Sequence, residues 1–349
     1  MNEWIDLRSD TVTQPTPAMR EAMANAEVGD DVYGEDPSIN KLQEMAAEIT
    51  GKEAGLFVSS GTMGNLVSVL AHCNRGDEVI MGNLGHTFLF EGGGIAALGG
   101  VHTHTIPNQA DGTLLLQDIK SAIREDNPHY PISRLLILEN TQNRCGGVAI
   151  TPEYTRQAAS LVHENGLSVH IDGARIFNAS AALNVPVAEL CEPADSVTFC
   201  LSKGLCAPVG SVICGSKEWI SKALRIRKMV GGGMRQAGIL AAAGIVALKE
   251  IAPRLGEDHL KAKQLAQGLS QIPGLYLDPG SPYTNMVFLN LSEEIQISTA
   301  EVAKRLLPYH IKVGAIDQHR FRLVCHYWIR MEDVPVIIRA FDEVIHHKA

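Results

Sequence analysis

The sequence predicts an α/β protein whose large domain has a mainly parallel sheet between layers of helices, followed by a smaller α+β C-terminal domain. Three observations predict this class. The chain has 349 residues, which is long for one core and short for three domains. Between residues 38 and 215, short apolar runs alternate with segments of helical periodicity, as in strand-helix units. The pattern changes after Leu248, where a long polar helix is expected.

The expected strands of the large domain are mostly unalternated apolar runs, which suits strands that are covered on both faces. These strands are Gly55–Ser59, Glu78–Met81, Leu135–Leu138, Leu167–Ile171, Ser196–Cys200 and Ser211–Cys214. The helices expected between them are Ile39–Thr50, Met63–Cys73, Pro152–Asn165 and Lys217–Met229. Strand-helix alternation at this spacing predicts a mainly parallel sheet.

The smaller domain is expected to mix helices and strands. Its helices are Ala252–Ser270, Thr299–Leu307 and Asp333–His347, and its strands are Met286–Leu291, Ile311–Ala315 and Phe321–His326. We therefore divide the chain into a large domain of residues 1–248 and a small domain of residues 249–349, with the segment at the start of the chain contributing to the large domain's site.

The composition excludes several classes of protein. Hydrophobic residues make up 45% and charged residues 20%, so fibrous and wholly disordered chains are excluded. Asp and Glu number 39 against 30 Lys and Arg, a net charge of −9 without a basic block, which argues against binding to nucleic acid or to a membrane surface. The longest apolar stretch, Gly238–Leu248, is too short to span a membrane.

The cysteines and the first residues predict a cytoplasmic location. The seven cysteines are an odd number without CxxC spacing, so neither a disulfide framework nor a zinc site is expected. Acidic residues Glu3 and Asp6 stand where a signal peptide would have a basic region and an apolar run.

Three strand ends carry unusual chemistry, and ligands of parallel α/β sheets bind at such ends. The first is the segment Val58–Asn65, where a strand ends in Ser60, Gly61 and Thr62 and opens directly into a helix. The free N–H groups, the helix dipole and the hydroxyls make a cradle for phosphate. The alternative is a Ser/Thr helix cap without a ligand.

The other two strand ends carry a carboxylate and a lysine. Asp172 ends an apolar strand, three residues before Arg175, and could bind the protonated ring nitrogen of a pyridine. It could also be a cap paired with its own Arg. Lys203 follows the next strand between Ser202 and Gly204, where a desolvated amine could form a Schiff base. A loop charge is the alternative. Together, in this order along the chain, the three features predict a site for pyridoxal 5'-phosphate.

Longer segments carry a family resemblance. They are Asp6–Thr13, Val28–Gly34, His170–Ala179, Leu201–Leu205, Gly231–Gln236 and Arg322–His326. In these segments the chain resembles, nearly end to end, the low-specificity L-threonine aldolases. This family belongs to the aspartate-aminotransferase-like (fold type I) superfamily of pyridoxal phosphate enzymes. The resemblance implies a three-layer large domain, and a dimer or homotetramer whose subunits share active sites.

The resemblance also implies roles for individual residues. Lys203 would bind the cofactor covalently, Asp172 would hold the pyridine nitrogen, and His86 would stack on the ring. Ser60, Gly61 and Thr62 would hold the phosphate together with Arg235 of a neighbouring subunit. The residues that would bind the substrate's carboxylate are Ser9, Arg175 and Arg322, of which Arg175 also borders the cofactor. Arg235 could instead be an interface cation, Ser9 a turn hydroxyl, and His86 a helix cap reaching Glu91.

One position departs from the family. Members commonly carry Glu-Asn-Thr-His-Asn, with the His near the substrate's β-hydroxyl, but here Gln142 replaces the His. Gln142 can hydrogen-bond a hydroxyl but cannot take its proton, so His86 becomes the expected base. His102 and His104 have strand-like spacing that could suit a metal, but without a third ligand in view we expect a surface pair and no metal site.

The reaction that the resemblance implies is retro-aldol cleavage of L-threonine or L-allo-threonine to glycine and acetaldehyde. The main alternative is a pyridoxal phosphate β-eliminating lyase or aminotransferase acting on another amino acid. A regulatory protein that retains the cofactor lobe is a third reading, against which the Lys203 and Asp172 pair argues. A metal-dependent D-threonine aldolase is disfavoured, because its barrel needs eight strand-helix units.

Overall fold

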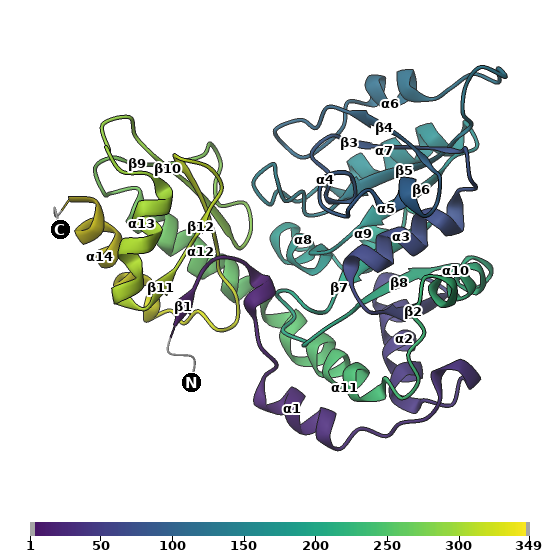
Figure 1. The fold of residues 1–349 in the computed structure, drawn as a ribbon, viewed down its shortest axis with the longest axis horizontal. Coiled ribbons are helices and arrows are strands. Elements are labelled where there is room, and N and C mark those ends of the chain that lie inside the picture. Colours follow the sequence, from purple (N-terminus) through teal and green to yellow (C-terminus); the bar gives the residue numbers. More distant parts are fainter. Residues whose placement is uncertain (1–3, 347–349) are drawn as a thin grey trace.

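A computed structural model describes residues 4–346, which form two lobes (Figure 1). The larger lobe contains a seven-stranded sheet. In spatial order its strands are β2 (Ala54–Val58), β8 (Ser211–Gly215), β7 (Ser196–Cys200), β6 (Ser168–Asp172), β5 (Ser133–Glu139), β3 (Glu78–Gly82) and β4 (His102–Ile106). Only β8 runs antiparallel to its neighbours, so the expected mainly parallel sheet is confirmed. The strand β4 was not among the expected ones.

Both faces of this sheet are covered. On β3, Ile80 belongs to one apolar core, whereas Val79 and Met81 belong to another on the opposite face. The helices of this lobe are α1 (Pro17–Ala24), α2 (Pro37–Thr50), α3 (Gly61–His72), α4 (His86–Leu89), α5 (Gly94–Ala97), α6 (Leu116–Ala122), α7 (Pro152–His163), α8 (Ile176–Leu183), α9 (Val187–Cys191), α10 (Lys217–Met229) and α11 (Gly238–Val246). Alternate residues of one strand thus pack against helices on opposite faces of the sheet, which gives the three layers expected from the sequence.

The apolar stretch after residue 237 forms α11, which packs against α1 and α2. None of the helices in residues 4–346 has the length and apolar character needed to cross a membrane.

The smaller lobe has its own antiparallel sheet, in the order β12 (Gly314–Ala315), β13 (Arg320–Val324), β10 (Met286–Leu291) and β9 (Leu275–Leu277). Its helices are α12 (Leu255–Leu269), α13 (Thr299–Leu306) and α14 (Asp333–His346). The single strand expected over Ile311–Ala315 is wrong in detail: Val313 separates β11 (Ile311–Lys312) from β12, and the two belong to different sheets.

The segment at the start of the described chain crosses to this lobe. The strand β1 (Ile5–Asp6) pairs in parallel with β11. Leu7 continues the pairing, since its N–H donates to the Lys312 carbonyl at 2.7 Å and its carbonyl accepts from Val324 N at 2.9 Å. Its side chain is fully buried in the core of the smaller lobe. The division after residue 248 stays a prediction, with this one segment packed across it.

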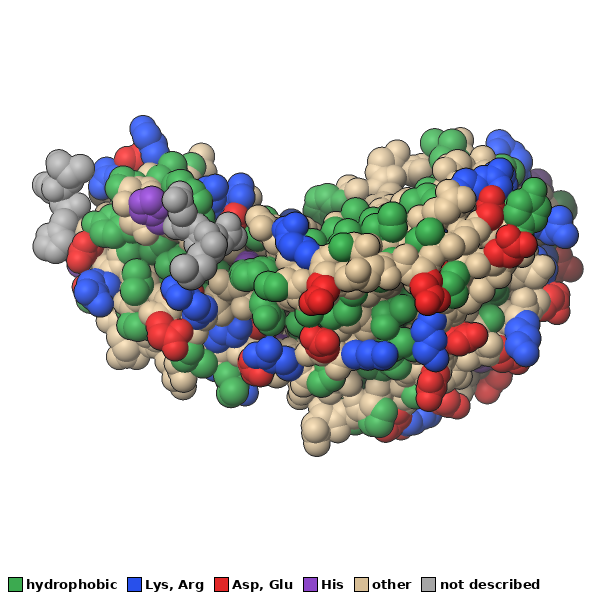
Figure 2. Space-filling model, turned by 90° about the horizontal axis from the view of Figure 1, so that it is seen from below, with side chains coloured by type: hydrophobic (Ala, Val, Ile, Leu, Met, Phe, Trp, Pro, Cys, Tyr) green, Lys and Arg blue, Asp and Glu red, His purple; other side chains and the backbone are tan. Residues whose placement is uncertain are grey.

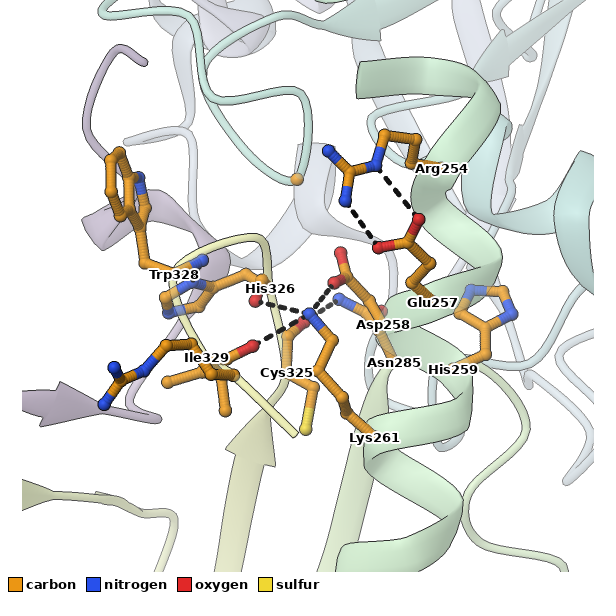
Figure 3. Close-up of polar contacts among 12 residues, drawn as sticks. Arg254, Glu257, Asp258, His259, Lys261, Asn285, Cys325, His326, Trp328 and Ile329 are labelled. Carbon is orange, nitrogen blue, oxygen red and sulfur yellow. Dashed lines mark hydrogen bonds and ion pairs between the residues drawn. The ribbon is translucent and has the colours of Figure 1, made fainter. Parts of the chain in front are cut away.

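A buried ammonium group ties α12 to the loop after β13 (Figure 3). Lys261 Nζ donates to the carbonyl oxygens of His326 at 3.1 Å and Ile329 at 2.9 Å, and it forms an ion pair with Asp258 at 2.5 Å. The ring of His326 in turn donates from Nε2 to the Asp6 carbonyl at 2.8 Å. The helix, the loop and the crossing segment are therefore held as one unit.

Candidate active site

The carboxyl ends of β6 and β7 lie side by side at one edge of the large sheet, because these strands are parallel neighbours. Asp172 is the last residue of β6, and Lys203 comes shortly after β7 ends at Cys200. Figure 2 shows that the molecular surface is hollowed between the two lobes. The predicted convergence of the strand-end residues is thus built into the sheet.

Asp172 is held as a buried hydrogen-bond acceptor. Asp172 is only 2% exposed, and its Oδ2 accepts a hydrogen bond from Asn65 Nδ2 at 2.8 Å. Its Oδ1 accepts from Ala174 N at 3.2 Å, which is the capping contact that the alternative interpretation allowed. The pairing with Arg175 is wrong, because Arg175 binds Asp10 instead. Asp172 therefore has donors from the protein but no cation from its own loop.

Lys203 is half-buried, and its ammonium makes no hydrogen bond or ion pair with any described residue. Its backbone carbonyl accepts from Thr13 Oγ1 at 2.8 Å, which fixes the loop. Its charge reaches Asp10: although burial alone would raise the pKa of Asp10, Arg175 and Lys203 hold that pKa at about 2. An unpartnered amine in a partly buried position suits a lysine that binds a ligand covalently.

The helix α3 begins at the cradle predicted from the sequence. Ser60 is its N-cap and accepts from Met63 N at 3.1 Å. Ser60 and Thr62 are exposed, and the first N–H groups of a helix have no partner within it. A side chain on Gly61 would place its Cβ 2.8 Å from Cys200 Sγ, so glycine allows the helix end to approach the end of β7. The donors suit a phosphate.

Arg235, expected at a neighbouring subunit's phosphate, lies exposed on this chain and donates from Nη1 to Asp30 Oδ2 at 2.8 Å. Its role across an interface stays a prediction.

His86 opens the short helix α4 and lines the cleft together with Phe90, Asn143 and Arg322. Its Nδ1 lies 2.9 Å from Glu91 Oε1, so the helix-cap contact with Glu91 does occur. This hydrogen bond, aided by the charge of Asp172, raises the pKa of His86 above its ordinary value. Because Glu91 occupies Nδ1, Nε2 is the ring nitrogen left for chemistry.

A second carboxyl group, the half-buried Glu139, stands at the end of β5 opposite Asp172. It accepts from His86 N at 2.7 Å and Asn143 N at 2.9 Å. Burial, followed by repulsion from Asp172, raises the pKa of Glu139 to about 7. Glu139 therefore joins the two loops that carry His86 and Asn143.

Gln142 is fully buried. Its Nε2 donates to the Leu84 carbonyl at 3.2 Å, and its Oε1 accepts from Cys145 N at 2.8 Å. The side chain borders a narrow cavity that His86 and Glu139 also line. The amide thus holds two loops together, and its expected contact with a substrate hydroxyl stays a prediction that would need one of these bonds to open.

The three residues expected to bind a carboxylate have different surroundings. Arg175 is buried and donates from Nε and Nη2 to the two oxygens of Asp10, at 2.7 and 2.6 Å. Ser9 accepts from Thr11 N at 3.2 Å, which is the turn contact of the alternative interpretation. Arg322 donates from Nη1 to Asn143 Oδ1 at 3.0 Å. Their substrate contacts stay predictions.

Arg322 is the strongest of the three as an anion site. Among residues 4–346 no carboxylate pairs with it. Burial, followed by the nearby charge of Arg175, lowers the pKa of Arg322. A half-buried guanidinium without a counter-ion favours an incoming anion, and a carboxylate fits it in two-point contact.

The histidines of β4 form a separate cluster at the sheet edge. His102 and His104 place their Nδ1 atoms 2.9 and 3.3 Å from the two oxygens of the buried Glu78. Arg124 binds the same carboxylate from Nε and Nη2. The sequence did not show that Glu78 is the shared partner of the two histidines. The guanidinium of Arg124 binds the Glu78 oxygens that a metal ion would need as ligands.

Sequence reasoning missed three polar residues of the site, Asp10, Asn65 and Glu139, and gave Glu91 only as a partner of His86. The available signal was a polar residue in an otherwise apolar segment. Asn65 stands among the small and apolar residues of α3, and Glu139 ends an apolar strand. Buried polar groups need partners, so such positions deserve to be treated as members of a network.

Comparisons with known proteins identify relatives of the chain and of its fold. A family model described as beta-eliminating lyase matches residues 6–294. A probable low-specificity L-threonine aldolase of Arabidopsis thaliana is 48% identical over 345 residues, covering 98% of this chain and 97% of the relative. A low-specificity L-threonine aldolase of Escherichia coli K12 is 49% identical over 300 residues, 86% of this chain and 88% of the relative. The solved threonine aldolase of Leishmania major shares the fold, with a TM-score of 0.82 at 20% identity over 97% of this chain and 99% of that one.

Proposed function

The chain belongs to the beta-eliminating lyase family, and from this premise we propose that it cleaves β-hydroxy-L-amino acids with pyridoxal 5'-phosphate as cofactor. Its substrates would be L-threonine and L-allo-threonine, and its products glycine and acetaldehyde. The observation that carries the proposal is the placement of Asp172 and the unpartnered Lys203 at the ends of two adjacent parallel strands.

The residues present fit the cofactor. Asp172 is a buried acceptor suited to the ring nitrogen, and Lys203 is a free amine suited to covalent attachment. Ser60, Gly61 and Thr62 offer the donors of a helix N-terminus to the phosphate. When bound, pyridoxal phosphate supplies an electron sink for bond cleavage at the substrate's α-carbon.

Two arginines would fix the substrate. Arg322 has no carboxylate partner within residues 4–346, and the Arg175 edge bearing Nη1 is not used by Asp10. Both can therefore meet the substrate's carboxylate, with Ser9 as a further donor. Binding the carboxylate in this way orients the substrate and so determines which bond to its α-carbon is aligned for cleavage.

His86 would take the proton of the β-hydroxyl at Nε2. Glu91 accepts from Nδ1–H at 2.9 Å and so keeps the proton-accepting lone pair on the other nitrogen. Gln142 is committed to the backbone and is not needed for this step.

We propose a homo-oligomer, a dimer or a tetramer, in which Arg235 of one subunit reaches the phosphate site of the next. Exposed apolar side chains near Arg235, at Met229 and Ile239, support an interface there. The cytoplasmic location remains a prediction from the sequence.

The test combines product analysis with mapping of the cofactor. Purified protein incubated with L-threonine, L-allo-threonine and phenylserine should release glycine and the matching aldehyde. Formation of a keto acid would instead indicate an aminotransferase or a β-eliminating lyase. Borohydride reduction should fix the cofactor to Lys203, and a label on another lysine would contradict the site assignment.

A further inference from the structure

A chain of buried hydrogen bonds leads away from Asp172 into the protein. Asn65 Nδ2 lies 2.8 Å from Asp172 Oδ2 and also 2.8 Å from Glu91 Oε1. Asn65 Oδ1 lies 3.4 Å from His170 Nε2. The chain continues on the other side of that ring, where Ser196 Oγ lies 2.8 Å from His170 Nδ1.

The last member is His72 at the end of α3, whose Nε2 lies 2.8 Å from the same Ser196 oxygen. The three inner residues Asn65, His170 and Ser196 are at most 2% exposed. Burial lowers the pKa of His170 to about 3 and that of His72 to about 4. Both rings are therefore neutral near neutral pH, and each carries one N–H.

The donor and acceptor capacities fix the direction of this chain. Two carboxylates surround Asn65 Nδ2, so this end of the amide must be the NH₂ group and its oxygen must face His170. Because Asn65 Oδ1 can only accept, His170 Nε2 must carry the hydrogen of this bond. The other ring nitrogen then accepts from the Ser196 hydroxyl, whose oxygen accepts from His72 Nε2–H.

Thr198 offers one competing arrangement. Its Oγ1 lies 3.3 Å from His170 Nε2 and could donate there, with the ring hydrogen moved to Nδ1. In that arrangement Asn65 Oδ1 would face a lone pair at 3.4 Å and would have no donor among the described residues. A buried acceptor without a donor is costly, which favours the hydrogen on Nε2.

We propose that Asn65 is a positioning residue of the active site, and that the directed chain His72–Ser196–His170–Asn65 orients the amide donor of Asn65 toward Asp172 and so holds that carboxylate in place for the cofactor's ring. Every donor in the chain points toward the carboxylate, so the bonds polarise one another. Three carboxyl groups crowd this site, and Asn65 is the neutral group that bridges Asp172 and Glu91. The inference rests on the proposed role of Asp172.

Two substitutions at Asn65 separate this role from simple packing. Asn65→Leu removes the donors at similar size, and cofactor affinity should fall by about ten- to a hundredfold, the effect of one lost hydrogen bond to a charged group. Asn65→Asp is the closer match in shape but adds a negative charge beside two others. We expect it to bind the cofactor more weakly than Asn65→Leu, whereas a packing role gives the opposite order. That opposite order would overturn the proposal.

The measurement is an equilibrium titration of cofactor-free protein with pyridoxal phosphate, followed by absorbance. Ser68→Ala is the matched control, because Ser68 is equally buried on the same helix and, among residues 4–346, its hydroxyl has one side-chain hydrogen-bond partner, Thr198 Oγ1, at 3.5 Å. It should change affinity by less than about threefold. Ser196→Ala interrupts the chain with two members, Asn65 and His170, between the substitution and Asp172, and it should give a loss between those of Ser68→Ala and Asn65→Leu.

Neutron diffraction from the holoenzyme gives a readout that does not depend on affinity or on turnover. It should place the ring hydrogens of His72 and His170 on Nε2, and a hydrogen on His170 Nδ1 would overturn the proposal even if the Asn65 variants do not fold. If the protein instead fails to cleave threonine while these hydrogens are found as expected, the proposed reaction is wrong and the hydrogen-bond chain stands.

Discussion

Arg175 and Asp10 form a two-point ion pair, in which Nε and Nη2 of the guanidinium donate to both carboxylate oxygens at 2.7 and 2.6 Å. Neither side chain is more than 7% exposed. Asp10 belongs to the segment that crosses to the smaller lobe, and Arg175 follows the strand that carries Asp172. The pair therefore holds that segment against the loop that follows β6, at the candidate active site.

Removing Asp10 should destabilise the protein strongly. Asp10→Ala leaves a buried guanidinium without a counter-ion, which costs about 3–5 kcal/mol. The free energy of unfolding in urea measures the loss. Glu257→Ala is the control, because its partner Arg254 and Glu257 itself are about half exposed, and such pairs contribute about 1 kcal/mol or less. Equal losses for the two variants would contradict the buried-pair interpretation.

Arg322→Ala should raise KM for L-threonine by about tenfold to a hundredfold, the effect of losing a charge-assisted hydrogen bond to the carboxylate. Cofactor absorbance should stay unchanged, because Arg322 contacts Asn143 and not the strand ends. Arg320→Ala is the control on the same strand, since Arg320 is already paired with Asp278. An unchanged KM in Arg322→Ala would remove this residue from the substrate site.

Turnover should rise with pH through the titration of His86, because only the neutral ring can take a proton. The hydrogen bond that His86 donates to Glu91, followed by the charge of Asp172, raises the pKa of His86, whereas burial and Lys203 lower it. The midpoint in kcat should therefore lie above the ordinary value of 6.5. Glu91→Gln removes the main cause and should move the midpoint to lower pH. A midpoint that does not move would exclude His86 as the titrating group.

His86→Ala should lower kcat by about 10²–10⁴, the contribution of a positioned base, while the cofactor remains bound. Gln142→His should not accelerate the reaction by a comparable factor. The new ring would lie where the amide now bonds Leu84 and Cys145, and we expect it to alter the preference between threonine and allo-threonine more than the better rate. Full turnover by His86→Ala, or equal acceleration of both diastereomers by Gln142→His, would refute the assignment.

The buried histidines should make the protein sensitive to acid. Burial lowers the pKa of His72 to about 4 from an ordinary value of 6.5. The stability that its neutral form contributes is present above pH 6.5 and is lost as the pH falls toward 4, on the order of 3 kcal/mol. His72→Gln cannot charge, so its free energy of unfolding should fall less steeply over this window. Above pH 7 the two curves should run parallel.

The sequence was sufficient to predict the strand ends. Asp172 and Lys203 follow apolar runs that could only be buried strands, and parallel neighbours bring such ends together. The direction of β8 was also within reach, because residues 201–210 are too few for a crossover helix and allow only an antiparallel return.

The partners of the site residues were not within reach. Asn65 reads as an ordinary polar residue of a helix, and its contact with Asp172 joins positions 107 residues apart. Arg175 was expected to pair with Asp172 or to bind the substrate's carboxylate, yet it binds Asp10, 165 residues away in the sequence. Such pairings depend on how the layers and lobes pack, and local periodicity carries no information about that packing.

The crossing segment has a consequence for the order of events during synthesis. Residues 5–7 leave the ribosome early, but their pairing partners at 311–312 and 324 are made near the end of translation. The large sheet can form as soon as residue 215 has emerged, and Arg175 is then present to bind Asp10, whereas β1 and Leu7 must wait for the smaller lobe before they are paired. Completion of the candidate active site is therefore among the last steps of biogenesis, because Arg322 of its cleft is also made late, and a nascent chain released early has Lys203 but lacks a finished pocket around it.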